Sequence, residues 1–513
     1  MSRRISWICI VLLLGLIIAL LLARFGSSGE AEASLQRFDH DVSASTELLD
    51  SLAVQNRGRI KPLDSFARER LFDIFGERTY ARLKPTLVIL SWALCPDRWF
   101  EEPIIKMEPA LADEFSAGSA PTDVTHISPK LLREKLHARG TPAMGGSAER
   151  KQSRSWRKLQ KRLMQFNMLA GDLRLFPRSG SEGWIALGAE AALETNGARD
   201  LHQMLTSSLE TLDVRQYSEA ASRLAAISSS TDDGLHPLRP RLVLELYCNR
   251  VGPFSLLGVL YLAIALIHSL GYVTSNGKLM RVACVASYPI AAFHVLAIVA
   301  RGIIAEKVMA SNTYEYILVM TAVTAIAALV LKVRYEEPAF GFIGDTLSGV
   351  GLAAIFLSPI SETVSQLPPV LKSDWMTYHV GAAVLSYGLL YLAFGVCIAF
   401  LFLSKDRQPE LRSRLYEMNL KLVRLGFFLL GLGIITGAIW ADKAWGRYWG
   451  WDPKESWSLI TWLIYGIFLH LRFCLPAKKH RATLVVVSIV GFIAVLFTFI
   501  GVNYILSGLH SYG

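Results

Sequence analysis

The chain has 513 residues, of which 52% are hydrophobic and 19% charged, and its formal net charge is +10. Its mean hydropathy of +0.35 is higher than expected for a wholly soluble globular protein. Six cysteines are present but no two form C-x-x-C, which excludes a thioredoxin-type reductant and a c-type cytochrome with its C-x-x-C-H attachment motif. The polarity changes along the chain: residues 24–252 are mixed and polar, whereas 253–513 form a series of long apolar runs.

The first apolar run, ISWICIVLLLGLIIALLL at residues 5–22, follows two arginines, Arg3 and Arg4. A positive start, an apolar centre and the small-x-small sequence AEA at 31–33 are typical of a signal peptide. The run is long for a signal peptide, so we interpret residues 1–23 as an uncleaved membrane anchor. A cleaved signal peptide is the alternative, and both interpretations give the remaining chain the same topology.

Residues 24–252 predict a mostly helical extracytoplasmic domain whose task the sequence does not reveal. The segment VQNRGRIKPLDSFARERLFDIFG predicts a turn at Gly58, an extended Lys61-Pro62 step and an amphipathic helix capped near Asp64. Further helices are expected at 130–170, around a flexible loop, and at 188–226. Cys95 and Cys248 would share an oxidising compartment, but the sequence does not decide whether they pair. The location argues against a nucleic-acid partner for the basic helices.

The apolar runs predict an all-α polytopic membrane protein with about nine transmembrane helices. Most runs reach the ~20 residues that a helix needs to cross a bilayer. Eight of them belong to a membrane domain at 253–513, near 253–272, 280–300, 314–331, 340–357, 379–403, 425–441, 457–471 and 483–505.

Basic residues in short loops predict the orientation, because such loops favour the cytoplasm. The basic segments 404–424 and 472–481 are expected to be cytoplasmic, together with the N-terminus. The large polar domain and the C-terminus are then extracytoplasmic. Lys443, Arg447 and Lys454 lie on the outer side against this trend, which indicates an anionic partner there.

The stretch AWGRYWGWDPKESWSLITW, starting at Ala444, holds five tryptophans in nineteen residues. Its second half predicts a helix start, with Asp452 as N-cap, Pro453 as first helical residue and Glu455 completing a capping box. Trp457 and Trp462 then lie near the membrane interface, where tryptophan is enriched.

Helix capping does not explain the tryptophans ahead of Asp452. Trp445 and Trp449 are four residues apart, and on a helical turn they would share a face. With Trp451 they would form an aromatic shelf, edged by Lys443 and Arg447. Such a shelf suits a flat apolar ring that carries carboxylates, and haem fits this description.

Histidines in or next to the predicted membrane helices are the candidate axial ligands for haem iron. With the predicted topology, His379 and His510 lie at the outer side, at the level of the tryptophan stretch. His470 and His268 lie at similar depths nearer the inner face, whereas His294 is midway along its helix. Ionisable residues in membrane helices are costly and usually functional.

The segment WGRYWGWDPKESWSLITWLIYGIFLHLR resembles the tryptophan-rich WWD signature of membrane proteins that handle haem in cytochrome c maturation. The resemblance is to the CcsA (ResC) subunit of the system II cytochrome c synthase, and places the WWD loop at 440–457. Three more segments resemble landmarks of this family: SNTYEYI, HVGAAVLSYGLLYLAFG and the terminal FIGVNYILSGLHSYG. A fifth, VQNRGRIKPLDSFARERL, resembles a segment ahead of the spans in extended members.

The resemblance implies haem b as the transported ligand. His379 and His510 would be axial ligands of an outer haem, over a platform of Trp445, Trp449, Trp451 and Asp452. His470 would hold an inner haem. Its second ligand would be His268 or a histidine from a CcsB (ResB) subunit.

The resemblance also implies partners and a reaction. The protein would reside in the bacterial inner membrane with a CcsB/ResB-like subunit, and would present haem for covalent attachment to apocytochrome c C-x-x-C-H motifs. Thiol-reducing thioredoxin-like proteins would keep those cysteines reduced. Whether the chain is itself an enzyme depends on its part in the synthase complex. Alternatives are system I-type haem delivery to a chaperone, a transporter for another anionic ring, and a haem-bearing electron-transfer subunit.

Overall fold

The computed structural model describes residues 3–25, 29, 31–115, 125–139, 147–176, 183–187, 189, 198–230, 238–358, 360–364, 366, 372–403, 408–474 and 477–506. Its contacts divide the chain into two compact units. The membrane unit comprises Met1–Phe25 and Val251–Gly513, and the polar unit comprises Gly26–Arg250.

The polar unit consists mainly of helices, with three two-stranded antiparallel sheets among the described residues. Its strands are β1 (Ala53–Asn56), β2 (Arg59–Pro62), β3 (Ile105–Lys106), β4 (His126–Ile127), β5 (Arg174–Phe176) and β6 (Ile185–Ala186). Its helices are α2 (Ala33–Asp41), α3 (Ser43–Asp50), α4 (Leu63–Ile74), α5 (Pro85–Leu94), α6 (Pro96–Trp99), α7 (Ala112–Phe115), α8 (Pro129–Arg139), α9 (Ser147–Asn167), α10 (Leu169–Asp172), α12 (Ala198–Thr211), α13 (Val214–Ser230) and α14 (Arg239–Val251).

Helix α5 forms the centre of the polar unit. All ten of its residues are buried, which suits a helix that is apolar on every face. The Trp92 ring packs edge-on against Tyr80, Trp99 and Phe166. This core explains how a domain of modest hydrophobicity folds around one apolar segment.

The predicted turn at Gly58 is confirmed as the turn of the β1–β2 hairpin. Arg57 and Gly58 both have positive φ, 49° and 75°, as a tight hairpin turn with the twist of its strands requires. The helix start predicted near Asp64 is confirmed, because α4 begins at Leu63 with Pro62 as N-cap, although no side chain caps it. The Asp64 carboxylate instead accepts hydrogen bonds from Arg68 Nε at 2.9 Å and from Asn249 at 3.0 Å.

The helices expected at 130–170 and 188–226 correspond to α8, α9, α12 and α13, although parts of both ranges lie outside the described residues. Cys95 and Cys248 are not joined in a disulfide. The Cys95 thiol is buried and lies 3.7 Å from the Thr206 carbonyl oxygen.

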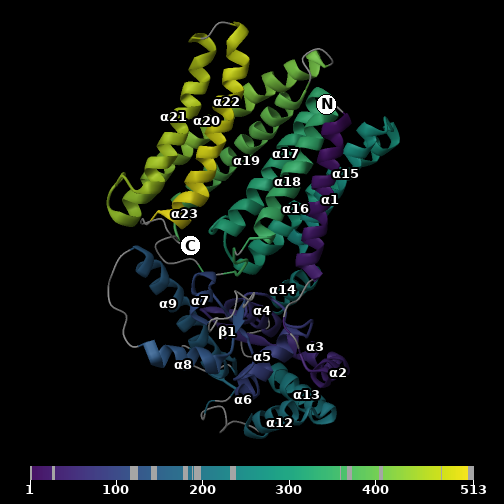
Figure 1. The fold of residues 1–513 in the computed structure, drawn as a ribbon, viewed down its shortest axis with the longest axis vertical. Coiled ribbons are helices and arrows are strands. Elements are labelled where there is room, and N and C mark those ends of the chain that lie inside the picture. The colour runs from purple at the N-terminus through teal and green to yellow at the C-terminus, as the bar shows by residue number, and fades with distance from the viewer. Residues whose placement is uncertain are drawn as a thin grey trace. The chain divides into compact units, whose positions relative to one another are not determined.

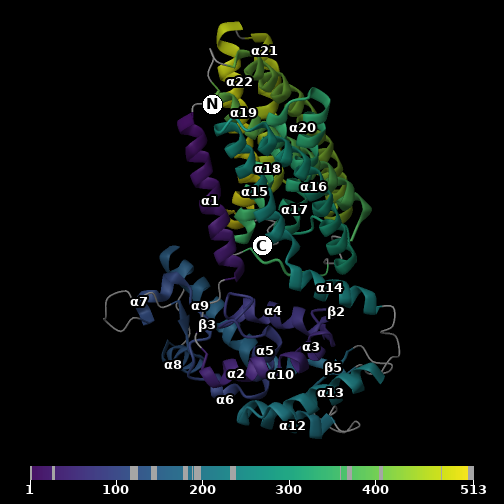
Figure 2. The ribbon, with the colours of Figure 1, turned by 90° about the vertical axis from the view of Figure 1, so that its right-hand side faces the viewer.

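The membrane unit is a bundle of long helices (Figure 1). Among the described residues, seven helices are long and apolar enough to cross a membrane, and α1 contains a shorter apolar helical segment, Ile8–Ala23. Figure 2 shows α1 running beside α15, against which it packs. The helices are α1 (Arg3–Phe25), α15 (Pro253–Val273), α16 (Gly277–Ala305), α17 (Thr313–Tyr335), α18 (Pro338–Phe356), α19 (Asp374–Phe402), α20 (Pro409–Trp445), α21 (Pro453–Cys474), α22 (Ala477–Leu496) and α23 (Val502–Ile505).

Helix α20 is much longer than its apolar run. The basic segment 404–424 was expected to be a loop, but the helix begins at Pro409 and continues unbroken for 37 residues. Apolar side chains of this segment, including Leu415 and Met418, are buried. The Arg412 guanidinium donates to the carbonyl oxygens of Phe400 and Leu403. These hydrogen bonds join the start of α20 to the end of α19. The basic residues therefore extend a helix rather than form a loop.

The last membrane helix changes its winding near its end. Between α22 and α23, residues Phe497–Gly501 form a π-helical turn. Such turns insert an extra residue per turn and often occur at functional sites. This turn contributes Thr498 and Phe499 to the cavity described below.

We predict that Glu245→Ala will strongly destabilise the polar unit. The Arg59 guanidinium and the Glu245 carboxylate form two hydrogen bonds, at 2.5 and 2.8 Å, and each side chain is 6% exposed. Removing one partner strands a buried charge, which costs about 3–5 kcal/mol. Hydrogen exchange of the β1–β2 amides in the detergent-solubilised full chain measures the loss.

The matched control is Glu219→Ala, which removes an exposed partner of Arg223 and should cost about 0–1 kcal/mol. Equal loss of amide protection in the two variants would contradict the structural role of the buried pair.

Candidate functional site

The tryptophan stretch begins at the end of α20. The helix ends at Trp445, and Gly446, with φ of 69°, donates its amide to the Asp442 carbonyl at 2.7 Å. The expectation that Trp445 and Trp449 share a helical face is therefore wrong. Trp445 contacts Trp440 edge-on with ring centres 4.7 Å apart, and Trp449 contacts Trp451 in the same way at 5.8 Å.

The predicted capping box at the start of α21 is confirmed. The Asp452 carboxylate accepts from the Lys454 amide at 2.9 Å, and Glu455 Oε2 accepts from the Asp452 amide at 3.2 Å. Glu455 Oε2 also accepts from the Gly450 amide at 2.8 Å. One carboxylate thus caps the helix and fixes the end of the loop that leads into it.

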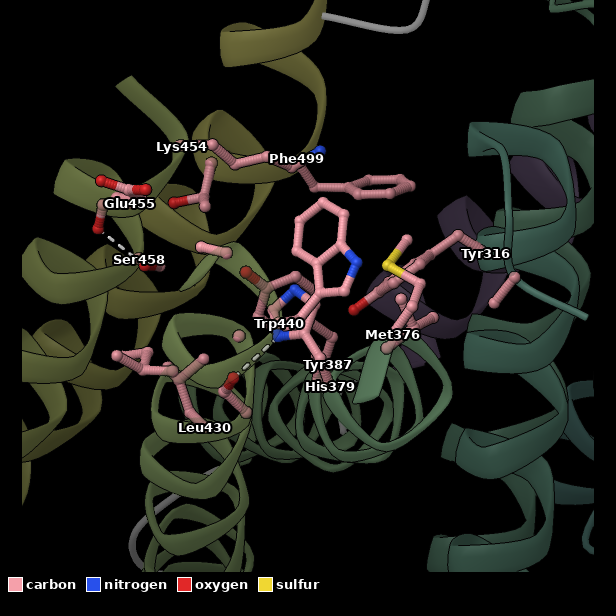
Figure 3. A pocket seen from close by; sticks show the side chains of 18 of the residues that line it. Tyr316, Met376, His379, Tyr387, Leu430, Trp440, Lys454, Glu455, Ser458 and Phe499 are labelled. Atoms are coloured by element: carbon pink, nitrogen blue, oxygen red, sulfur yellow. Dashed lines mark hydrogen bonds between the residues drawn. The ribbon is translucent and has the colours of Figure 1, made fainter. Parts of the chain in front are cut away.

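His379, in the second turn of α19, is held against α20. Its Nδ1 lies 2.7 Å from the Gly433 carbonyl oxygen. Because a carbonyl only accepts, Nδ1 carries the proton and Nε2 carries the lone pair. A Cβ at Gly437 would lie 2.6 Å from Nδ1, so only glycine permits this approach. The Trp440 ring lies parallel to the imidazole, within 4°, at a centre distance of 6.3 Å (Figure 3).

A cavity of about 170 Å³ lies beside this histidine. Its wall comes from the loop before α17, from α17, α19, α20 and α21, and from the π-helical turn with α23. Figure 3 shows His379 and Trp440 at its centre, Lys454 to one side, and Met376 and Tyr316 to the other. Four segments that are distant in sequence, SNTYEYI, the His379 segment, the tryptophan stretch and FIGVNYILSGLHSYG, each contribute residues to it.

Three hydrogen-bond donors of the cavity wall are incompletely paired within the described part of the chain. Lys454 Nζ donates to the neutral Asn503 Oδ1 at 3.1 Å, and the Asp452 carboxylate attracts the ammonium through space. Trp449 Nε1 and the Tyr316 hydroxyl are buried and have no hydrogen-bond partner among the described residues. The wall therefore presents donors to whatever occupies the cavity.

The other predicted residues of the outer site lie elsewhere. Trp445, Arg447, Trp451 and Asp452 are not among the described residues that line the cavity. Trp451 is 71% exposed and Arg447 is also exposed. Lys443 lies over the Trp375 ring, with Nζ 5.4 Å from its centre. The predicted ligand His510 lies outside the described residues.

The two predicted inner histidines are not brought together. His470 is exposed on α21, and its Nδ1 donates to the Gly466 carbonyl at 2.8 Å. His268 is 4% exposed on α15, with Nε2 3.4 Å from Cys284 Sγ and Nδ1 3.9 Å from Asp345. Helices α21 and α15 lie on opposite sides of the membrane unit (Figure 1). The structure therefore does not support one iron shared by this pair.

Known proteins match the part of the chain that builds this cavity. Residues 310–510 match the family model described as "Cytochrome C assembly protein". The cytochrome c biogenesis protein CcsA of Prochlorococcus marinus is 32% identical over 252 residues, which cover 43% of this chain and 80% of that protein. CcsA of Mesostigma viride is 34% identical over 235 residues, 40% of this chain and 76% of that protein.

This chain belongs to the CcsA family of cytochrome c biogenesis proteins. Protein NrfI of Wolinella succinogenes is also similar, at 29% identity over 482 residues. That match covers 89% of this chain, so similarity extends well beyond residues 310–510. The chain spans about half of NrfI, 53% of its length.

Several cavity residues of this CcsA-family chain were not assigned as site residues from sequence. Trp440, Tyr316 and Phe499 are apolar or aromatic residues within helices, where spacing does not distinguish a cavity wall from ordinary packing. Lys454 was noted only as a charge against the topological trend. One sequence feature could have identified two of these residues. Tyr316 and Phe499 belong to SNTYEYI and FIGVNYILSGLHSYG, which resemble family landmarks.

We predict that Glu455→Ala will loosen the loop ahead of α21. The change removes the acceptor of the Gly450 and Asp452 amides and should cost about 0.5–2 kcal/mol, as for other lost caps. Faster hydrogen exchange at residues 450–452 measures this effect. Glu410→Ala, in the first turn of α20 and exposed, is the control and should leave those amides unchanged. Unchanged exchange in Glu455→Ala would show that the carboxylate does not hold the loop.

Proposed function

We propose that the protein holds haem in this cavity and presents it for attachment to apocytochrome c. One observation carries the proposal: the Gly433 carbonyl accepts from His379 Nδ1, so Nε2 carries the lone pair that an iron ligand needs, beside a parallel indole and in the wall of a cavity. Metal-binding histidines usually donate their other ring nitrogen to a carbonyl or carboxylate in this way. Membership of the CcsA family supports the assignment.

The cavity residues suit haem as a substrate. Trp440, Trp449, Tyr316 and Phe499 provide aromatic surface for a flat macrocycle, and Lys454 provides a positive charge. The cavity reaches the surface at Tyr448, which is 60% exposed. A ring larger than the enclosed 170 Å³ can therefore project from it, as presentation to a second protein requires.

The proposed reaction needs orientation more than acid–base chemistry. His379 would occupy one axial position of the iron, and the family resemblance assigns the other to His510. The histidine of an apocytochrome C-x-x-C-H segment would displace one imidazole. Each cysteine thiol then adds its sulfur and its hydrogen across one haem vinyl group, so no oxidant or reductant is consumed. Holding the vinyl groups in place for the thiols supplies the rate enhancement.

We further propose that His470 receives haem on the inner side with help from a CcsB/ResB-like subunit. The His470 ring is exposed on α21, where a second membrane protein can reach it. His268, by contrast, is enclosed by its own neighbours. The match covers 53% of NrfI, and the remainder of that protein leaves room for a segment that serves the same purpose.

The proposed location is the bacterial inner membrane, with the N-terminus in the cytoplasm. Arg3, Arg4 and the basic start of α20 support this orientation. The cavity and the polar unit then work outside the cytoplasm. Thioredoxin-like reductants would keep the apocytochrome cysteines reduced there.

His379→Ala is expected to abolish cytochrome c assembly by removing the axial imidazole. The measurement is co-expression with an apocytochrome c and a CcsB-like subunit in cells without their own maturation system, scored by haem stain. Added imidazole should restore part of the yield because it can fill the vacated axial position.

His40→Ala is the matched control, because the His40 side chain is 90% exposed in the polar unit. It should leave the yield of cytochrome c unchanged. Wild-type yield in His379→Ala would refute the ligand assignment, and loss without any imidazole rescue would point to a structural role instead.

The inner site gives a second prediction. His470→Ala should lower the haem content of the protein purified with a CcsB-like subunit, because it removes an iron ligand. His268→Ala should leave the haem content nearly unchanged, since that ring is buried between α15, α16 and α18. Pyridine haemochrome absorbance measures both. Normal haem in His470→Ala, or equal loss in the two variants, would overturn this assignment.

A further inference from the structure

We infer that Lys454 is the counter-ion for a carboxylate of the ligand held in the cavity, and that this carboxylate lies on the α21 side. The inference rests on the proposed function and assigns the orientation of the substrate within the site. It replaces the sequence expectation that Arg447 and Lys443 receive the haem carboxylates. Those two residues lie outside the described cavity wall, whereas Lys454 is part of it.

The first step concerns the charge of Lys454. Its side chain is partly buried, in the first turn of α21, and its ammonium donates to a neutral acceptor, Asn503 Oδ1. A charge removed from water is costly unless it is paired. The Asp452 carboxylate attracts the ammonium through space, whereas the hydrogen bond of Nζ goes to a neutral amide. An anionic group in the cavity would add a direct ion pair to this partial compensation.

The second step concerns the two neighbouring acids. Asp452 accepts from the Lys454 amide, and Glu455 accepts from the amides of Gly450 and Asp452. Both carboxylates are therefore engaged by backbone donors of the capping box. They fix the backbone that carries Lys454, and Asp452 also attracts its ammonium through space.

The third step concerns the other polar groups of the wall. Trp449 Nε1 and the Tyr316 hydroxyl lack a partner among the described residues, and Tyr316 is only 8% exposed. Indole has no acceptor, and an ammonium has none either. The indole and the ammonium can only donate and the Tyr316 hydroxyl can also donate, so these groups fit a ligand that carries acceptors, and a dicarboxylic macrocycle is such a ligand.

The opposite wall differs in character. Figure 3 places Lys454 and Met376 on opposite sides of the Trp440 ring. Met376 offers an apolar thioether, and Phe499 adds an aromatic face to the same cavity. The carboxylate edge of the macrocycle would then face α21, and its opposite edge would face Met376 and Tyr316, near the starts of α19 and α17.

The test compares the binding of haem with that of haem dimethyl ester, in which both carboxylates are esterified. Purified full-length protein, depleted of haem, is titrated with each ring and followed by absorbance. The wild type should prefer the free acid by about tenfold to a hundredfold, as expected for a charged hydrogen-bonded pair. Lys454→Met should bind both rings equally. Lys454→Met with the wild-type preference would overturn the inference.

A second variant tests the charge without removing the lysine. Asn503→Asp places a carboxylate beside the Lys454 ammonium and should also abolish the preference for haem over its dimethyl ester. This variant tests the inference if Lys454→Met fails to fold. Lys443→Met is the charge control, and Met376→Ala is the cavity control. Both should keep the wild-type ratio, and a ratio lost in either would place the carboxylate elsewhere. A wild type that binds neither ring would instead refute the proposed function.

Discussion

The close approach of α19 to α20 is the constraint on which the site depends. The His379 ring can reach the Gly433 carbonyl only because Gly437 has no side chain in the space the ring occupies. Small residues commonly allow such close contact between membrane helices. As a result, the direction of the imidazole is set by two packed helices rather than by a loop. The parallel Trp440 ring comes from the same pair, so ligand and platform are fixed together.

Much of the fold could be predicted from the sequence because a helix that crosses a lipid bilayer requires a long run of apolar residues. The apolar runs correspond to helices α15 to α22, and their bounds differ mainly where polar residues extend a helix. At 409–424 the side chains that pack inward are mostly apolar, whereas the exposed ones are mostly charged. Average hydropathy cannot separate such an amphipathic helix from a loop, because it ignores which face each residue occupies.

The site was predictable where its interactions are local. The capping box spans four residues, so Asp452 and Glu455 could be assigned from their spacing. The prediction that Trp445 and Trp449 share a helical face was wrong because Gly446, in the left-handed conformation, ends the helix before Trp449. The spacing of the tryptophans does not indicate this helix end. Trp440, Tyr316 and Lys454 meet only through tertiary packing. They come from α20, α17 and α21. The packing of these helices brings them together, and no local sequence pattern predicts that packing.

The two inner histidines show how burial separates candidates that the sequence treats alike. His268 has polar neighbours of its own, in Cys284 and Asp345, so its position is stable within one chain. His470 has its Nδ1 satisfied by its own helix, but its exposed ring faces the surroundings of the bundle. Ionisable residues of membrane helices almost always face protein or water rather than lipid. An exposed histidine on α21 is therefore expected to face water or another protein rather than lipid, and the proposed partner subunit would supply that protein surface.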